Sequence, residues 1–342
     1  MNLADLNKIA LAMVTPGKGI LAADESSGTI KKRFDAIKVE STEESRRDYR
    51  EMLFRSGEAM SKYISGVILY DETIWQNAKD GKPLVRLIEA SGAIPGIKVD
   101  EGTQALPNCP GELATIGLDK LAERLKKYYE RGARFAKWRA VIDIAGGNIP
   151  SMTAIHVNAH ALARYAALCQ AAQIVPIVEP EVLMDGDHDI DRCYEATSRV
   201  LNKTFQELRA QRVALEGMIL KPNMAIAGKK SSKHASVEEV AEKTIRLLKA
   251  CVPAAVPGIA FLSGGQSDEE ATAHLNAMNR IGNLPWRLTF SYGRALQAAP
   301  QKAWSGKAEN AAAGQRAFTH RARMNALASK GEWETGLEKK AA

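Results

Sequence analysis

The stretch LEGMILKPN, residues 215–223, is an apolar run that ends in a lysine followed by a proline. Such a run predicts a buried strand, and Pro222 ends its ladder because proline has no backbone donor. Lys221 is therefore expected at the rim of a sheet. A lysine there can extend its ammonium group into solvent, or it can act as an amine nucleophile that forms an imine with a carbonyl.

Short apolar runs like this one alternate with amphipathic stretches along the whole chain. Eight strands are predicted, over residues 19–25, 65–72, 95–101, 133–141, 174–181, 217–223, 258–265 and 286–293. Strands that alternate with helices predict parallel pairing. Eight such units predict a closed (β/α)8 barrel, with residues 1–342 as a single domain.

Helical spacing separates the predicted strands. Residues 117–132 place apolar side chains on one face, and Gly132 predicts a left-handed stop. Residues 236–251 have the same pattern, and a further helix is expected to open at Ser41 with Glu44 as its capping-box partner. An open doubly wound sheet is the alternative, but it calls for a glycine-rich phosphate loop after the first strand. Residues 23–26 read Ala-Asp-Glu-Ser, which favours the barrel.

The composition of the chain limits the kinds of molecule that the protein is expected to bind. The 342 residues carry 47 Lys and Arg against 40 Asp and Glu, a formal net charge of +7. Because this excess is spread along the chain without aromatic clusters, it favours small anionic substrates over nucleic acid. No apolar stretch approaches the roughly 18 residues that span a bilayer, and the N-terminus lacks signal-peptide features, so we expect a cytoplasmic protein with no membrane partner. Four separated cysteines without a CxxC pair predict reduced thiols.

Charged side chains close nearly every predicted strand at its carboxyl end, where barrel active sites lie. They are Asp24, Asp71, Glu72, Lys98, Asp100, Lys137, Arg139, Glu179, Glu181, Lys221 and, just past the last strand, Arg294. One or two such charges are ordinary solvated residues. A ring of them around one mouth predicts a functional site.

Two lysines and several carboxylates in one pocket are typical of Schiff-base catalysis. A lysine attacks a carbonyl only as the neutral amine, which burial and a second cation favour. Lys137 is the candidate cation and Lys221 the nucleophile. Glu179 and Glu181 share a strand face and can transfer protons, unless they only balance the lysines; Asp24 can meet a substrate hydroxyl.

Phosphate binding is predicted after the last two strands. Ser263, Gly264 and Gly265 follow one of them, and Gly293 and Arg294 follow the other. Barrels often bind phosphate there through backbone N–H groups, and arginine adds a bidentate donor. A second cationic set, Lys98 and Arg139 with Arg33, is expected to hold another phosphate.

Eight sequence blocks together resemble class I (Schiff-base) fructose-bisphosphate aldolases over nearly the whole chain. They are LAADES (21–26), KVDEG (98–102), AKWRAV (136–141), VPIVEPE (175–181), GDHDI (186–190), ALEGMILKPNM (214–224), FLSGGQS (261–267) and LTFSYGRALQ (288–297). The resemblance implies cleavage of fructose 1,6-bisphosphate to two triose phosphates, in glycolysis and gluconeogenesis.

The resemblance also implies residue roles. Lys221 forms the imine, Asp24 and Lys137 act near the scissile bond, and Glu179 is the principal proton shuttle with Glu181 as its partner. The phosphate of the dihydroxyacetone half is expected at Ser263, Gly264, Gly293 and Arg294. The other end of the substrate is expected at Ser26, Thr29, Arg33, Lys98 and Arg139.

The same resemblance implies a homotetramer and no cofactor or metal, because a protonated imine takes up the charge that zinc would otherwise stabilise. His156 and His160, or His188, are the best metal-ligand candidates, but the pair has no third partner nearby in sequence, which favours surface or packing roles.

The last tyrosine is Tyr292, whereas many animal and plant members end in a tyrosine that reprotonates the enamine, so we expect slower proton exchange on bound dihydroxyacetone phosphate than in those relatives. The tail from about residue 331 is expected to be mobile.

Two alternatives remain. A transaldolase-like enzyme or another Schiff-base sugar-phosphate lyase would share Lys221 but lack paired phosphate sites. A non-catalytic basic scaffold would leave the carboxylates unexplained.

Overall fold

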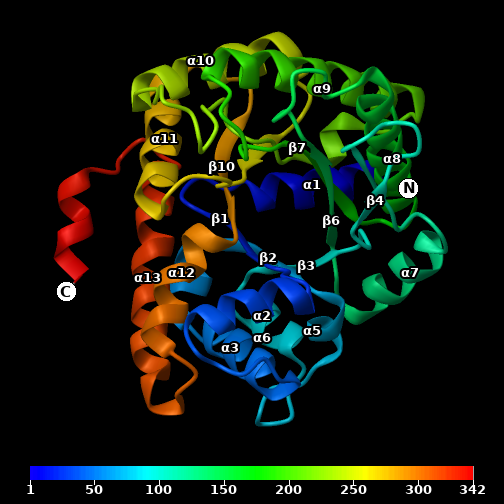
Figure 1. The fold of residues 1–342 in the computed structure, drawn as a ribbon. Coiled ribbons are helices and arrows are strands. Elements are labelled where there is room, and N and C mark those ends of the chain that lie inside the picture. The colour runs from blue at the N-terminus through cyan, green and yellow to red at the C-terminus, as the bar shows by residue number, and fades with distance from the viewer. Residues whose placement is uncertain (342) are drawn as a thin grey trace.

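Eight parallel strands close into a barrel in the computed structural model, which describes residues 1–341 (Figure 1). Around the barrel the strands follow the order β1, β10, β9, β8, β7, β6, β3, β2. Their bounds are β1 Gly19–Ala23, β2 Ile64–Leu69, β3 Ile94–Lys98, β6 Phe135–Ile142, β7 Val175–Val182, β8 Ile219–Leu220, β9 Gly258–Phe261 and β10 Arg287–Tyr292. The (β/α)8 barrel predicted from the sequence is confirmed, and each predicted strand overlaps an observed one.

Helices lie between the strands and cover the outside of the barrel (Figure 1). They are α1 Leu3–Met13, α2 Ser27–Ala36, α3 Glu43–Phe54, α4 Gly57–Lys62, α5 Asp71–Trp75, α6 Leu84–Ala90, α7 Leu121–Arg131, α8 Met152–Ala171, α9 Ile190–Ala210, α10 Val237–Cys251, α11 Asp268–Ile281, α12 Arg294–Trp304 and α13 Ala311–Ala328. Short 3-10 turns are η1 Leu215–Gly217, η2 Ala308–Asn310 and η3 Thr335–Ala341.

Helix α1 closes the amino-terminal end of the barrel. Leu6, Ala10 and Met13 are fully buried and form one apolar cluster with strand side chains such as Phe135 and Ile177. Burying the side chain of Leu6 or Met13 from water contributes about 1.5–3 kcal/mol. The cluster makes this end of the barrel a packed core.

Two glycines make room for the largest side chain of this cluster. A Cβ on Gly66 would lie 2.9 Å from the Phe135 ring, and a Cβ on Gly96 would lie 2.3 Å from it. Since neither distance is tolerated, β2 and β3 carry glycine where they face Phe135 of β6. The ring thus fills the barrel interior.

Several local predictions are corrected by the structure. Strand β8 covers only Ile219–Leu220 of the predicted residues 217–223, because Gly217 belongs to the turn η1 and Pro222 has no backbone donor to continue the ladder. The N–H of Lys221 still donates to the Val178 carbonyl at 2.8 Å. The capping box opens helix α3 at Thr42 with Ser45, one residue later than Ser41 and Glu44. A hairpin of β4 (Thr103–Ala105) and β5 (Leu113–Thr115), absent from the prediction, precedes α7.

The predicted start of α10 and the predicted end of α7 hold, whereas α7 begins at Leu121 rather than at residue 117, because Lys120 has a φ of 53° and lies outside the helical region. Helix α10 begins after Ser236, whose side chain accepts from the Glu239 N–H. Helix α7 ends at Gly132, which has a φ of 118° and so adopts the left-handed stop expected of it. No helix within residues 1–341 is long and apolar enough to cross a bilayer.

The end of the chain contacts α13. Trp333 is buried, and the Glu338 carboxylate accepts from Arg321 at 2.7 Å, His320 at 2.9 Å and Trp333 at 3.1 Å. These contacts are formed within the segment expected to be mobile from about residue 331; its mobility stays a prediction. Ala342 lies outside the described residues.

Candidate active site at the carboxyl end of the barrel

A cavity of about 1100 Å³ opens at the carboxyl end of the strands. Its lining includes every residue to which the sequence assigns a catalytic or phosphate-binding role: Asp24, Ser26, Thr29, Arg33, Lys98, Lys137, Arg139, Glu179, Glu181, Lys221, Ser263, Gly264, Gly293 and Arg294. Glu72, one of the charged residues at the predicted strand ends, does not line the cavity and pairs with Arg46 instead. The fold therefore brings together groups that are up to 270 positions apart in the chain. Their roles stay predictions.

Lys221 and Lys137 share one carboxylate. Lys221 Nζ lies 3.1 Å from Glu179 Oε1, and Lys137 Nζ lies 3.5 Å from Glu179 Oε2. All three side chains are about 5% exposed. The parallel register explains the arrangement, because β6 and β7 align Arg139 with Glu179 while Lys221 follows β8 beside Val178. A buried amine thus has a proton acceptor in direct contact.

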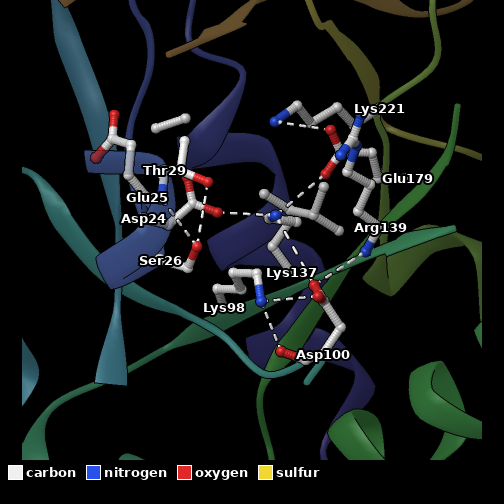
Figure 2. Close-up of polar contacts among 12 residues, drawn as sticks. Asp24, Glu25, Ser26, Thr29, Lys98, Asp100, Lys137, Arg139, Glu179 and Lys221 are labelled. Carbon is white, nitrogen blue, oxygen red and sulfur yellow. Dashed lines mark hydrogen bonds and ion pairs between the residues drawn. The ribbon is translucent and has the colours of Figure 1, made fainter. Parts of the chain in front are cut away.

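Lys137 is surrounded by carboxylates (Figure 2). Besides Glu179, its Nζ lies 2.8 Å from Asp24 and 3.9 Å from Asp100. Burial opposes its charge, but the carboxylates of Asp24 and Glu179 outweigh burial and raise the pKa of Lys137 above its ordinary value. Lys137 is therefore a fixed cation in the site, as its predicted role requires.

The pKa of Asp24 shifts in the opposite direction to that of Lys137. Burial would raise its pKa, but the charges on Lys137 and Lys221 lower it from 3.8 to about 2. Asp24 is therefore ionised at any pH where the protein works. A carboxylate with so low a pKa is a weak base, so it is better suited to orient a hydroxyl than to remove its proton.

The second glutamate of β7 has a different partner. Arg139 Nε donates to Glu181 Oε2, and burial of the guanidinium is outweighed by this carboxylate, which raises the pKa of Arg139. Lys98 Nζ lies 2.7 Å from Asp100 Oδ1. The two predicted cations of the second phosphate set are thus held by carboxylates that a bound phosphate would have to compete with.

The predicted phosphate loop follows β9. Gly265 has a φ of 78°, which favours glycine, and a Cβ on Gly264 would lie 2.2 Å from Met184 Cε, so the Met184 side chain packs directly against this loop. Arg294 donates to the Gln266 carbonyl, which connects this loop to the start of α12. Backbone N–H groups beside an arginine are suited to a phosphate.

Arg33 was predicted to act with Lys98 and Arg139. Its guanidinium lies beside Gly293: a Cβ built on that glycine would be 3.5 Å from Arg33 Nη2. Arg33 Nη1 also donates to Glu25. Its place among the ligands of the second phosphate stays a prediction.

Two buried carboxylates lacked a predicted role. Glu25 accepts from Arg33 and from Gln297, the latter at 2.7 Å. Asp100 accepts from Lys98 and from the Arg139 N–H at 3.3 Å (Figure 2). Both hold cations in place. Each stands in a recognised block, LAADES or KVDEG, but only the three-dimensional pairing indicates its role.

None of the three histidine candidates, His156, His160 and His188, is among the residues that line the cavity. His156 and His160 of α8 approach the two oxygens of Glu207 at 3.3 and 3.1 Å, and Lys203 binds the same carboxylate at 2.8 Å. Glu207 is a third partner that sequence spacing did not reveal, and Lys203 already neutralises it. Within residues 1–341 no three His, Cys, Asp or Glu side chains form a group able to hold a metal ion. Metal independence remains an expectation.

These observations define a (β/α)8 barrel with a lysine-centred site at its carboxyl end. A family model described as fructose-bisphosphate aldolase class-I matches residues 5–342. The chain belongs to the class I fructose-bisphosphate aldolases, a family of lyases.

Individual relatives agree. A probable fructose-bisphosphate aldolase class 1 of Xanthomonas campestris is 57% identical over 98% of this chain and 100% of its own. Fructose-bisphosphate aldolase 1 of Toxoplasma gondii is 55% identical over 97% and 92%. The solved structure of a Plasmodium falciparum fructose-bisphosphate aldolase, in complex with TRAP and an inhibitor, has a TM-score of 0.94, with 49% identity over 98% of this chain and 96% of its own.

Proposed function

We propose that this protein reversibly cleaves fructose 1,6-bisphosphate to dihydroxyacetone phosphate and glyceraldehyde 3-phosphate through an imine on Lys221, in glycolysis and gluconeogenesis. One observation carries the mechanism: the buried Lys221 amine lies 3.1 Å from Glu179, whose other oxygen faces Lys137. Membership of the aldolase family supports the reaction, and the geometry supports the assignment of its steps.

Imine formation begins when Lys221 gives a proton to Glu179. The neutral amine attacks the ketone carbon, and Glu179 returns a proton to the carbinolamine hydroxyl, which leaves as water. The product is a protonated imine with its positive charge next to the bond that breaks. Burial keeps competing water from this carbon.

Cleavage moves the C3–C4 electron pair into the imine, which becomes a neutral enamine. The C4 hydroxyl loses its proton as C4 becomes the aldehyde carbon. Because the pKa of Asp24 is about 2, Glu179 is the better acceptor for this proton, while Asp24 and the Lys137 ammonium orient the hydroxyl. Protonation of the enamine at C3 and hydrolysis then release dihydroxyacetone phosphate and restore Lys221.

The phosphates are assigned to opposite sides of the cavity. Ser263, Gly264, Gly293 and Arg294 would hold the phosphate next to the ketone. The other phosphate would be held by Ser26, Thr29, Arg33, Lys98 and Arg139. Glu181 supports Glu179 indirectly, since it binds Arg139.

The setting is proposed as well. We expect a homotetramer in the cytoplasm, with sugar and triose phosphates as its small-molecule partners and no nucleic acid or membrane partner. A cytosolic aldolase of Arabidopsis thaliana is 54% identical over 94% of this chain and 81% of its own.

The test is a cleavage assay with an excess of chelator. We expect undiminished cleavage of fructose 1,6-bisphosphate and little transfer activity with sedoheptulose 7-phosphate. Faster reaction with the seven-carbon sugar would indicate a transaldolase-like enzyme instead. Loss of activity on chelation would contradict a metal-free imine mechanism.

A further inference from the structure

Two loops meet at the rim of the cavity next to the predicted phosphate loop. The segment after β7 and the segment after β8 are joined by three backbone hydrogen bonds, from Gly228 N to His188 O at 2.8 Å, from Lys229 N to Met184 O at 2.8 Å and from Lys230 N to Gly186 O at 2.9 Å. These bonds fix where the main chain of Lys229 lies. Its side chain and that of Asp185 line the cavity, whereas Lys230 is not among the lining residues.

Lys229 is connected to the glycines after β9 through one side chain. Its N–H binds the Met184 carbonyl, and the Met184 side chain contacts Gly264 and Gly265 so closely that a Cβ on either glycine would lie 2.2 or 2.3 Å from it. Lys229 therefore stands on the same side of the cavity as Ser263 and Gly264, with a long flexible stem.

The ion pair of Lys229 differs from the others in the site. Lys229 Nζ lies 2.7 Å from Asp185 Oδ1, with 46% of the lysine and 54% of the aspartate side chain exposed. Lys137 and Lys221, in contrast, pair with carboxylates that are 12% exposed or less. An exposed ion pair contributes little to stability, so the ammonium group can readily leave its carboxylate for another anion. A phosphate dianion is a stronger partner than one exposed carboxylate.

We propose that Lys229 is a further substrate-binding residue: its ammonium leaves Asp185 and binds the ketose phosphate held at Ser263 and Gly264, and Asp185 competes for it. The inference rests on the proposed function, and it assigns Lys229 to the phosphate next to the ketone. Asp185 thereby sets how tightly phosphorylated ketoses bind. The two residues act on binding and leave the chemistry at Lys221 unchanged.

The pair gives opposite predictions for its two members. Imine formation with dihydroxyacetone phosphate is followed by borohydride trapping, and the half-saturating concentration is measured. Lys229→Met raises it about tenfold, because one charge-assisted contact is lost. Asp185→Asn lowers it about threefold, because the competing carboxylate is removed. Lys230→Met, the matched control from the same loop, changes it less than about twofold.

Two further readings define the outcome. The Lys229→Met effect shrinks in about 0.5 M salt, since the contact is exposed and screened, and the same factor holds for fructose 1,6-bisphosphate. Equal values for Lys229→Met and Lys230→Met would overturn the inference, and so would a weaker binding of Asp185→Asn or an effect confined to the bisphosphate. Failure of the unaltered protein to be trapped at all would instead contradict the proposed function.

Discussion

The two ends of the barrel are built from opposite kinds of side chain. At the amino-terminal end, Leu6, Ala10 and Met13 of α1 bury apolar surface against the strands. At the carboxyl end, Lys137, Glu179 and Lys221 are equally buried but charged. Removing charges from water has a free-energy cost that their mutual attraction only partly offsets. One end of the fold therefore supplies stability, and the other holds groups that stability alone does not explain.

The largest effect expected is on activity at the charged end. Lys221→Ala should lower kcat by on the order of 10⁵-fold, because the nucleophile is lost. Steady-state cleavage of fructose 1,6-bisphosphate measures it. Lys18→Ala, before β1 at the opposite end, is the control and should keep full activity. Substantial activity in Lys221→Ala would contradict the assignment of catalysis to the charged end of the barrel.

A smaller loss of activity is expected at the proton shuttle. Glu179→Gln keeps the shape of the side chain but removes its basicity, so kcat should fall by about 10³-fold. Borohydride trapping should still reach Lys221, only more slowly, which separates this variant from Lys221→Ala. Unchanged kcat would assign the proton transfer to another group.

The amino-terminal end should respond in stability. Leu6→Ala is expected to lower the free energy of unfolding by about 3 kcal/mol, since it opens a cavity between α1 and the strands. Urea unfolding measures it, and kcat should stay within about twofold of the original. Leu11→Ala, on the same helix but 38% exposed, is the matched control and should change stability by less than about 0.5 kcal/mol. An equal loss of stability in both variants would contradict the packing of α1 against the amino-terminal end of the strands.

The smallest expected effect is the pH dependence that Asp24 confers. Its folded-state pKa of about 2 lies below its ordinary value of 3.8, so its ionisation stabilises the fold above pH 3.8 and this contribution is lost as pH falls through about 2. The stability difference between the original protein and Asp24→Asn should be about 1 kcal/mol smaller at pH 3 than at pH 6. Urea unfolding at the two pH values tests this. A difference that grows on acidification would reverse the sign of the interaction.

Much of the charged end could be predicted from the sequence. Side chains alternate along strands, and parallel strands present their carboxyl ends on one side of a barrel, so Asp24, Lys137, Glu179 and Lys221 had to converge. Their convergence in one cavity is confirmed. Strand alternation does not predict the roles of Glu25 and Asp100, because these roles depend on which cation of another element lies close to each carboxylate.

The apolar end was harder to predict. An amphipathic helix such as α1 has a buried face, but its sequence does not say which surface that face covers. The hairpin of β4 and β5 was missed for a related reason: most of its residues are exposed and lack an apolar alternation. The capping box moved by one residue because Ser45, rather than a glutamate, returns the hydrogen bond to Thr42.

The most direct measurement is the identity of the lysine that carries the substrate. Dihydroxyacetone phosphate is added with borohydride, the protein is digested with trypsin, and the modified peptide is fragmented in a mass spectrometer. The account predicts one adduct, on Lys221 within residues 213–229. An adduct on Lys98, Lys137 or Lys229, or none on Lys221, would contradict it.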